Sequence, residues 1–342
     1  MTKMKKDFLE LLNIYAVSGK EKPVRKYLQK KLEGVVDTMK VDDYGNLLAE
    51  KSYGDGDGAV VLLSAHMDTV RGVLKNRNII QNNDIIMADV GALGADDRAG
   101  IAIILDVLDR TPRTGFNGVI KIAFSREEEI GCIGAGKIKE EWYEDVDLAI
   151  VVDRRGNRDI VTGCFDAFCS DSVGYFMEDV SKMADMNWQC VEGGISDALV
   201  FSSVGVNSIN ISAGYYNEHT DREYASLTDM KDSVKLIIQT LAVINTFRFS
   251  FGDVPHKNEW VNEGRFNSYS SGYETYNYYD HYYEDSFEND VWAEEKDING
   301  DTYVYEVGDS VIIQQGENEI ILSRGAFKSM MNQVNGCLEK SF

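Results

Sequence analysis

Short apolar runs without polar alternation mark the predicted strands of this 342-residue chain. Four of these runs lie at residues 46–49, 59–65, 119–124 and 148–152. Apolar runs of this length, rich in β-branched residues, are typical of strands that are covered on both faces. Between and after them, apolar side chains recur at helical spacing over residues 97–108 and 230–247. Strands that alternate with helices predict an α/β fold, with a mostly parallel central sheet flanked by helices, over residues 1–250.

The N-terminal region predicts two helices. Apolar residues from Phe8 to Tyr15 have helical spacing, which indicates the first helix. The sequence Ser18-Gly19-Lys20-Glu21 resembles a capping box, and Pro23 stands where the first turn of a helix tolerates proline. We therefore expect a second helix to begin there and to be capped by these side chains.

The composition changes after residue 250. Residues 251–300 are acidic and rich in tyrosine, and we expect a linker or an irregular segment there. Short apolar runs at residues 303–307, 311–314 and 319–322 then predict strands, and residues 326–334 have helical spacing. The chain thus divides into a catalytic domain (1–250), the acidic segment (251–300) and a small, β-rich hairpin-plus-helix unit (301–342). Because tyrosine-rich segments suit protein interfaces, self-association or a protein partner through this region is a further hypothesis.

The charge balance narrows the classes of partner. The chain has 35 Lys and Arg against 57 Asp and Glu, a formal net charge of −22. A surface this acidic repels phosphate groups, so we expect neither nucleic acid nor a membrane as a partner. No stretch approaches the roughly 20 apolar residues of a membrane span, and the N-terminus lacks the apolar core of an export signal. Together with five scattered cysteines, these features predict a cytoplasmic protein.

Five places along the chain present a side chain that can bind a metal ion, each beside or after an apolar run. They are His66, Asp96, Glu129, Asp153 and His219. Loops beyond the carboxyl ends of parallel strands share one edge of the sheet, so residues far apart in sequence can meet there. Singly, each place has a plainer explanation, such as a hydrogen-bonded His-x-Asp pair, a solvated acidic triplet or a helix cap. Their joint occurrence favours a metal centre.

The motifs in this order resemble those of a known family. The sequences AHMDT, GADDRAG, EEEIG, VVD and GYYNEHTDREY, with AVSGKE near the N-terminus and GGISD before the last histidine, span about residues 5–247. This set resembles the co-catalytic di-zinc exopeptidases, nearest to peptidase T-like (tripeptide aminopeptidase) and TET-like aminopeptidases. The segments 69–95 and 157–192 are too short for the inserted lid or dimerisation domain of either branch. The resemblance implies a three-layer zinc-exopeptidase-like domain without that insert.

The resemblance also implies a role for each residue. Asp96 would bridge two divalent metal ions, Zn²⁺ first and Co²⁺ or Mn²⁺ as alternatives. The remaining ligands would be His66 and Asp153 for one ion, and Glu129 and His219 for the other. Asp68 would accept a hydrogen bond from the second ring nitrogen of His66. Glu128 matches the general base of the family.

These roles predict an exopeptidase that hydrolyses the N-terminal bond of short peptides through a bridging hydroxide, with Glu128 as the base. An amidohydrolase that removes acyl groups from amino acids is the alternative within the fold, because the same centre would serve it. Arg154 or Arg155 would favour it by holding a substrate carboxylate, unless Asp159 or Glu127 pairs with them. A non-catalytic binding protein is the alternative of another class, although such proteins usually lose a ligand or the base.

Overall fold

The computed structural model describes residues 2–164, 166–245, 251–255, 302–307, 310–315 and 318–323. The chain divides into two compact units, Met1–Glu274 and Thr275–Phe342. The candidate metal-binding residues all belong to the first unit, whose described part is an α/β structure. No helix among the described residues is long and apolar enough to cross a membrane.

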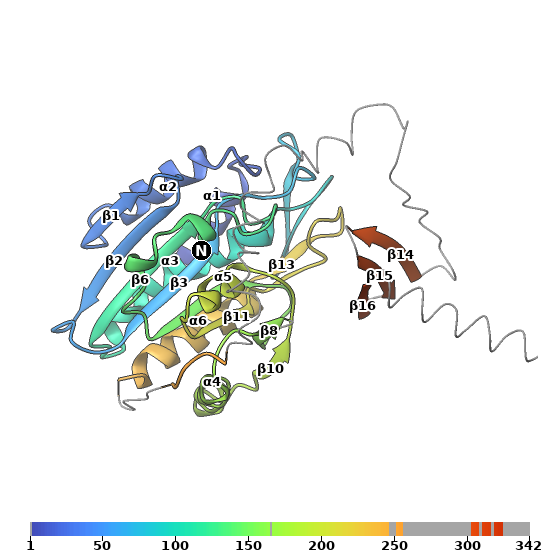
Figure 1. Ribbon diagram of the computed structural model, residues 1–342. Coiled ribbons are helices and arrows are strands. Elements are labelled where there is room, and N and C mark those ends of the chain that lie inside the picture. The colour runs from blue at the N-terminus through green and yellow to red at the C-terminus, as the bar shows by residue number, and fades with distance from the viewer. Residues whose placement is uncertain are drawn as a thin grey trace, which may run out of the picture. The chain divides into compact units, whose positions relative to one another are not determined.

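A nine-stranded sheet forms the centre of the first unit (Figure 1). Its strand order is β1 (Thr38–Val41), β2 (Leu47–Tyr53), β6 (Gly118–Ser125), β3 (Val60–His66), β7 (Leu148–Arg154), β11 (Ser208–Ser212), β8 (Asp159–Cys164) and β10 (Gln189–Glu192), with β9 (Asp166–Ala167) paired to β8. The four central strands β6, β3, β7 and β11 are parallel, whereas β1 and β2 are antiparallel at one edge. The predicted α/β class is confirmed.

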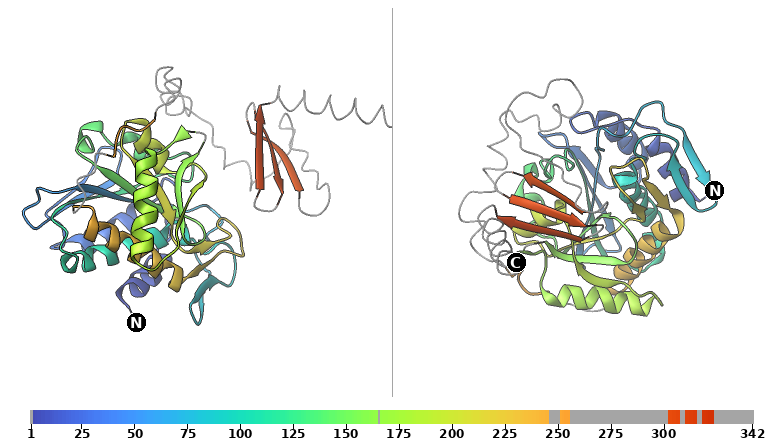
Figure 2. Two further views of the ribbon diagram at one scale, coloured as in Figure 1. Left: turned by 90° about the horizontal axis from the view of Figure 1, so that it is seen from below. Right: turned by 90° about the vertical axis from the view of Figure 1, so that its right-hand side faces the viewer.

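Helices cover both faces of this sheet, as Figures 1 and 2 show from three sides. They are α1 (Lys3–Leu12), α2 (Lys22–Leu32), α3 (Ala95–Arg110), α4 (Asp171–Met183), α5 (Asp197–Ser203) and α6 (Leu227–Val243). Alternate residues of β3 point to opposite faces: Val61 and Leu63 pack with the cluster that contains α1, α3 and α6, while Leu62 packs with the cluster that contains α5. The predicted three layers follow from this alternation.

Three short 3₁₀ helices, Thr111–Arg113, Ala135–Lys137 and Glu140–Trp142, are the remaining helical elements among the described residues of this unit. A second sheet joins two distant loops of the first unit. It has the order β12 (Tyr215–Tyr216), β13 (Tyr224–Ser226), β5 (Ile85–Ala88) and β4 (Ile79–Asn82), and all of its pairs are antiparallel. Ala225 pairs with Ile86, so the loop before α3 lies against the loop that carries His219. This sheet therefore positions His219 relative to Asp96.

The two segments named as too short for an inserted domain contain regular structure. Residues 69–95 form the β4–β5 hairpin, and residues 157–192 form β8, β9, α4 and β10. The second segment extends the central sheet, since β8 pairs with β11 and with β10. Its strands escaped the sequence pattern because their positions are only partly buried and lack a continuous apolar run.

The predicted capping box is wrong. The helix α2 begins at Lys22 with Glu21 as its N-cap, and no side chain caps it. The Ser18 hydroxyl instead donates a hydrogen bond of 2.7 Å to Asp68. The Glu21 carboxylate accepts from the Gly19 N–H and from Arg126. Charged tertiary partners bind these side chains more strongly than a helix terminus does.

The described part of the second unit is a three-stranded antiparallel sheet of β14 (Thr302–Val307), β15 (Ser310–Gln315) and β16 (Asn318–Ser323). These strands coincide with the three predicted runs. The predicted helix at residues 326–334 and most of the predicted acidic segment lie outside the described residues.

Candidate metal centre

The candidate ligands come from loops at one edge of the central sheet. His66 is the last residue of β3, Asp153 lies near the end of β7, and Glu128 and Glu129 follow β6. These three strands are parallel neighbours, so their carboxyl ends coincide. Asp96 lies at the start of α3, and His219 lies between β12 and β13. The structure brings all of these side chains together.

Asp96 links the two histidines through its two carboxylate oxygens. Its Oδ1 lies 2.9 Å from Nε2 of His66, and its Oδ2 lies 3.2 Å from Nε2 of His219. The neighbouring Asp97 points elsewhere, since its carboxylate accepts the backbone N–H groups of His66 and Gly100. The geometry therefore selects Asp96 over Asp97 as the residue between the histidines.

The first half of the centre surrounds His66. Nε2 of His66 lies 3.6 Å from Oδ1 of Asp153 and 3.9 Å from Oε2 of Glu128. One ligand atom from each of these three residues lies within 4.8 Å of the other two. The Tyr215 hydroxyl donates a hydrogen bond of 3.0 Å to Asp153. His66 itself is buried, with 1% of its side chain exposed.

The second half surrounds His219. Nε2 of His219 lies 2.8 Å from Oε2 of Glu129. His219 stands in a loop with a φ of 65°, and 47% of its side chain is exposed. Consecutive glutamates therefore serve different halves: Glu128 faces His66, and Glu129 faces His219.

Asp68 fixes the loop that carries both glutamates. Its carboxylate accepts the backbone N–H groups of Glu128 at 3.1 Å and Glu129 at 3.3 Å, and the hydroxyl of Ser18. Its Oδ1 also lies 3.3 Å from Nδ1 of His66, and its backbone oxygen lies 3.1 Å from the same nitrogen. Asp68 thus orients a histidine and both glutamates at once.

Several supporting residues were not predicted. Arg126 donates to Glu21, to Glu127 and to the backbone oxygen of Tyr44, and the Tyr44 hydroxyl donates to Glu127. These contacts hold the start of the glutamate loop, where Glu127 has a φ of 54°. No local motif signals them, because their partners are distant in sequence.

Two buried acids also escaped prediction. Glu223 accepts the backbone N–H groups of Gly94, Ala95 and Asp96 and so holds the start of α3. Asp197, the last residue of the GGISD motif, accepts the Ser125 hydroxyl at 2.5 Å, and one ligand atom from each of Glu128, Cys132 and Asp197 lies within 4.8 Å of the others. The GGISD motif could have indicated Asp197, but no pattern in the sequence indicated that Ser125 is its hydrogen-bond partner.

The centre carries more negative than positive charge. Burial, and next Asp96, raise the pKa of Glu129 to about 7, and burial raises the pKa of Asp153 to about 7 although His66 opposes it. Burial opposes a charge on His219, but hydrogen bonds to Asp96 and Glu129 raise its pKa to about 12. Hydrogen bonds from both histidines hold the pKa of Asp96 below its usual range against the effect of burial. Because buried carboxylates outnumber the histidines here, bound cations would stabilise their charged forms.

The residues fit divalent metal ions. Imidazole nitrogens and carboxylate oxygens are ligands of zinc, cobalt and manganese. Oε1 of Glu129 is buried and has no hydrogen-bond partner among the described residues, which is what a ligand oxygen requires. Charged carboxylates at these positions repel one another, and a bound cation would remove that repulsion.

The two arginines near the centre have carboxylate partners. Nε of Arg154 lies 3.4 Å from Asp159, and Arg155 donates a bond of 2.9 Å to Glu218, the residue before His219. The pairing of Arg154 with Asp159 is the one considered from the sequence. Glu127 pairs with Arg126 instead.

Comparisons with known proteins agree with this fold. The M42 glutamyl aminopeptidase family matches residues 72–236. A protein of Acetivibrio thermocellus named as a candidate aminopeptidase is 22% identical and matches 69% of this chain and 98% of its own length. A Pyrococcus furiosus protein named as a candidate LysW-lysine/LysW-ornithine hydrolase is 40% identical over 85 residues, which are 25% of this chain. The chain spans about a quarter of that relative's length, 24%.

Solved structures share the fold. Aminopeptidase PepT from Bacillus cereus has a TM-score of 0.65 at 16% identity, with 71% of this chain and 98% of that chain covered. The TET1 peptidase of Pyrococcus horikoshii has a TM-score of 0.54 at 18% identity, with 70% and 99% covered. The predicted resemblance to the co-catalytic zinc exopeptidase superfamily, and within it to peptidase T-like and TET-like proteins, is confirmed. The fold therefore resembles that of metal-dependent peptidases and related hydrolases.

Proposed function

We propose that this chain is a metal-dependent aminopeptidase that acts on short peptides. Two divalent ions would be held by His66, Asp153, Glu129 and His219, with Asp96 between them, and zinc suits this donor set best. When bound, such ions supply an acidified water molecule and a Lewis acid for the peptide carbonyl. The observation that supports this best is the position of Asp96, which reaches both histidines at once.

Glu128 would act as the general base and then as the general acid. Its Oε2 faces His66, and its Oε1 accepts a hydrogen bond of 3.3 Å from the Cys132 thiol. Burial raises the pKa of Glu128 well above its usual range, which favours a carboxyl that both takes and returns a proton. Glu128 would take the proton of the attacking water and deliver it to the departing amine. The backbone bond to Asp68 holds it in place for both steps.

Charge favours recognition of the substrate amino terminus. The chain has a net charge of −22, and Glu218 and Asp221 lie beside His219. A protonated amine is attracted by such a rim, whereas a substrate carboxylate is repelled unless an arginine reaches it. Arg154 and Arg155 are both engaged with acids.

The test compares three forms of one tripeptide on the metal-loaded protein. We expect the free and C-terminally amidated forms to be hydrolysed at similar rates, and the N-acetylated form to resist hydrolysis. The Glu128→Gln variant is the control for a contaminating peptidase. Cleavage of the acetylated form together with resistance of the amidated form would refute aminopeptidase activity.

A second candidate is removal of an acyl group from an amino acid. It is favoured by the relative named as a LysW-lysine/LysW-ornithine hydrolase, whose matched stretch is 40% identical to this chain. Release of lysine or ornithine from N-acyl conjugates, without release of residues from ordinary peptides, would select this candidate. A non-catalytic role is disfavoured because the five ligands and the base are all present.

Self-association is part of the proposal. The TET1 peptidase of P. horikoshii can assemble into a tetrahedron or a large octahedral shell. Sedimentation of the purified chain measures whether it also forms an assembly.

A further inference from the structure

The helices α1 and α2 carry a charge opposite to that of the rest of the protein. Residues 3–31 contain nine Lys and Arg and three Asp and Glu, whereas the whole chain has a net charge of −22. The buried residues Val24, Leu28 and Leu32 face the core, so the opposite side of α2 faces solvent. The positive charge is therefore presented on the surface.

Three exposed lysines, Lys22, Lys26 and Lys30, form a stripe along α2 at intervals of four residues. Like charges at this spacing repel on a helix, and Lys22 also lies in the first turn, where the helix dipole disfavours a cation. None of the three forms an ion pair with another described residue, whereas Lys31 pairs with Asp7 and Glu10. The stripe destabilises α2 locally, and an anionic partner would reverse that effect.

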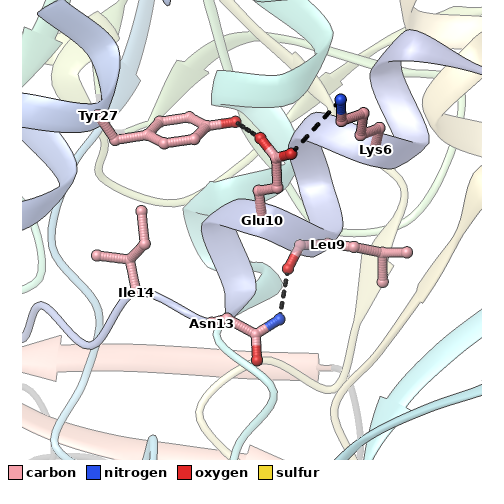
Figure 3. Close-up of a pocket in the computed structure, with 6 residues that line it drawn as sticks. All are labelled: Lys6, Leu9, Glu10, Asn13, Ile14 and Tyr27. Carbon is pink, nitrogen blue, oxygen red and sulfur yellow. Dashed lines mark hydrogen bonds and ion pairs between the residues drawn. The ribbon is translucent and has the colours of Figure 1, made fainter. Parts of the chain in front are cut away.

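A groove of about 550 Å³ lies between α1 and α2, and Tyr27, which lines it, stands one residue from Lys26 and three residues from Lys30 of the stripe. Figure 3 shows its lining residues, among which Leu9, Ile14 and the ring of Tyr27 are apolar. Lys6 lies at its edge, close to Glu10, and the Tyr27 hydroxyl donates to Glu10. An apolar wall beside a row of cations fits a ligand that carries aromatic rings and carboxylates together.

The chain itself contains such a ligand. Residues 271–290 have six Asp and Glu, six Tyr, and no Lys or Arg. We propose that the α1–α2 surface of one copy binds the acidic, tyrosine-rich segment at residues 271–290 of a second copy. Because each copy has a net charge of −22, contacts between acidic surfaces of two copies are repelled, whereas the contact between the lysine stripe and the acidic segment is favoured by charge. Nucleic acid and anionic membranes fit the lysines but are repelled by the rest of the protein.

The experiment exchanges the charges of the two partners in the full-length chain. One variant carries Lys22→Glu, Lys26→Glu and Lys30→Glu, and the other carries Glu284→Lys, Asp285→Lys and Glu288→Lys. Sedimentation velocity at low salt should show concentration-dependent association of the unmodified chain, weakened about tenfold or more in each variant alone and by added salt. An equimolar mixture of both variants should associate again, because the acidic α2 surface of the first variant attracts the basic segment of the second.

A matched control separates the stripe from net charge. The variant Lys137→Glu, Lys139→Glu, Lys231→Glu has the same net charge as the first variant, and these lysines are exposed on other elements. It should associate like the unmodified chain, and circular dichroism should show that all variants keep their helices. A monomeric unmodified chain, equal loss in the control, or a mixture that stays dissociated would each overturn the proposal. Stripe-dependent binding to phosphatidylserine vesicles or to DNA without self-association would also overturn it.

Discussion

His66 and His219 approach the same carboxylate from opposite surroundings. His66 ends a core strand and is 1% exposed, whereas His219 belongs to a loop and is 47% exposed. Each half receives one of two consecutive glutamates, Glu128 or Glu129. Solvent therefore reaches the centre on the His219 side. The His66 half therefore belongs to the core of the fold, whereas the His219 half depends on an exposed loop.

The largest expected effect separates the two glutamates. Glu128→Gln should lower kcat/KM for a peptide substrate by about 10²–10⁴-fold and leave the metal content unchanged, because it removes the base and no ligand. Glu129→Gln should release metal from the His219 half. Metal content by elemental analysis and turnover are measured on the same preparations. Equal metal loss in both variants would contradict the division.

The next test acts where the two halves meet. Asp96→Asn should weaken metal binding by at least about tenfold, because it removes the charge between two cations. Asp97→Asn is the matched control, since its carboxylate accepts backbone N–H groups and faces neither histidine ring. Calorimetric titration of the metal-free proteins measures both. The reverse order of affinities would mean that the neighbouring aspartate is the ligand.

The pH dependence of the metal-free protein tests both halves together. Burial raises the pKa of Asp153 and Glu129 to about 7, against about 4 in an unfolded chain. The folded state then binds more protons than the unfolded state between these values, so the free energy of unfolding falls as pH rises. The raised pKa values of His66 and His219 act in the same direction, because their stabilisation is present below pH 6.5 and lost at higher pH.

Urea unfolding in the presence of a chelator measures this dependence. We expect the free energy of unfolding to be lower at pH 8 than at pH 5 by at least about 2–3 kcal/mol, which is the contribution of one carboxyl whose pKa is raised from about 4 to about 7. Added zinc should remove the loss at pH 8, because cations replace the missing protons. If the free energy of unfolding of the chelated protein instead rose with pH, the buried carboxyls would not have raised pKa values.

The smallest effect compares the histidines by stability alone. His66→Ala should lower the free energy of unfolding of the metal-free protein by about 2 kcal/mol, because it leaves a cavity and removes a partner of buried acids. His219→Ala should lower it less than His66→Ala does, because an exposed loop residue leaves no cavity in the core, although Asp96 and Glu129 lose a partner. Thermal unfolding in chelator measures both. Similar losses would mean that the His219 loop is as integral to the fold as β3.

The same contrast explains what the sequence could predict. The strands β3, β6 and β7 were predictable because burial on both faces requires continuous apolar runs. The proximity of the residues at their ends was predictable because parallel neighbours share an edge, and their role as ligands stays a prediction. The strands β8 and β10 were not, since they are only partly buried at the side of the sheet.

Residues that act through distant partners escaped prediction. Ser18 matched a local capping pattern, but its partner Asp68 lies in another loop. Arg126 and Glu223 are ordinary charged residues in sequence, and only the fold brings Glu21 and the start of α3 to them. Short-range patterns contain the helix and strand periods, but they do not contain contacts between loops.

The spread of the centre along the chain has a consequence for its synthesis. His66 is made early, whereas His219 and the strand β13 that positions its loop come near the end of the first unit. Contacts of such long range form late in folding, after the strands between them have paired. A nascent chain that stops before His219 has one of the two histidines of the centre, and one that stops before β13 lacks the strand that positions the His219 loop. If the centre holds two ions as proposed, their stable uptake would require that the chain has been made and folded as far as β13.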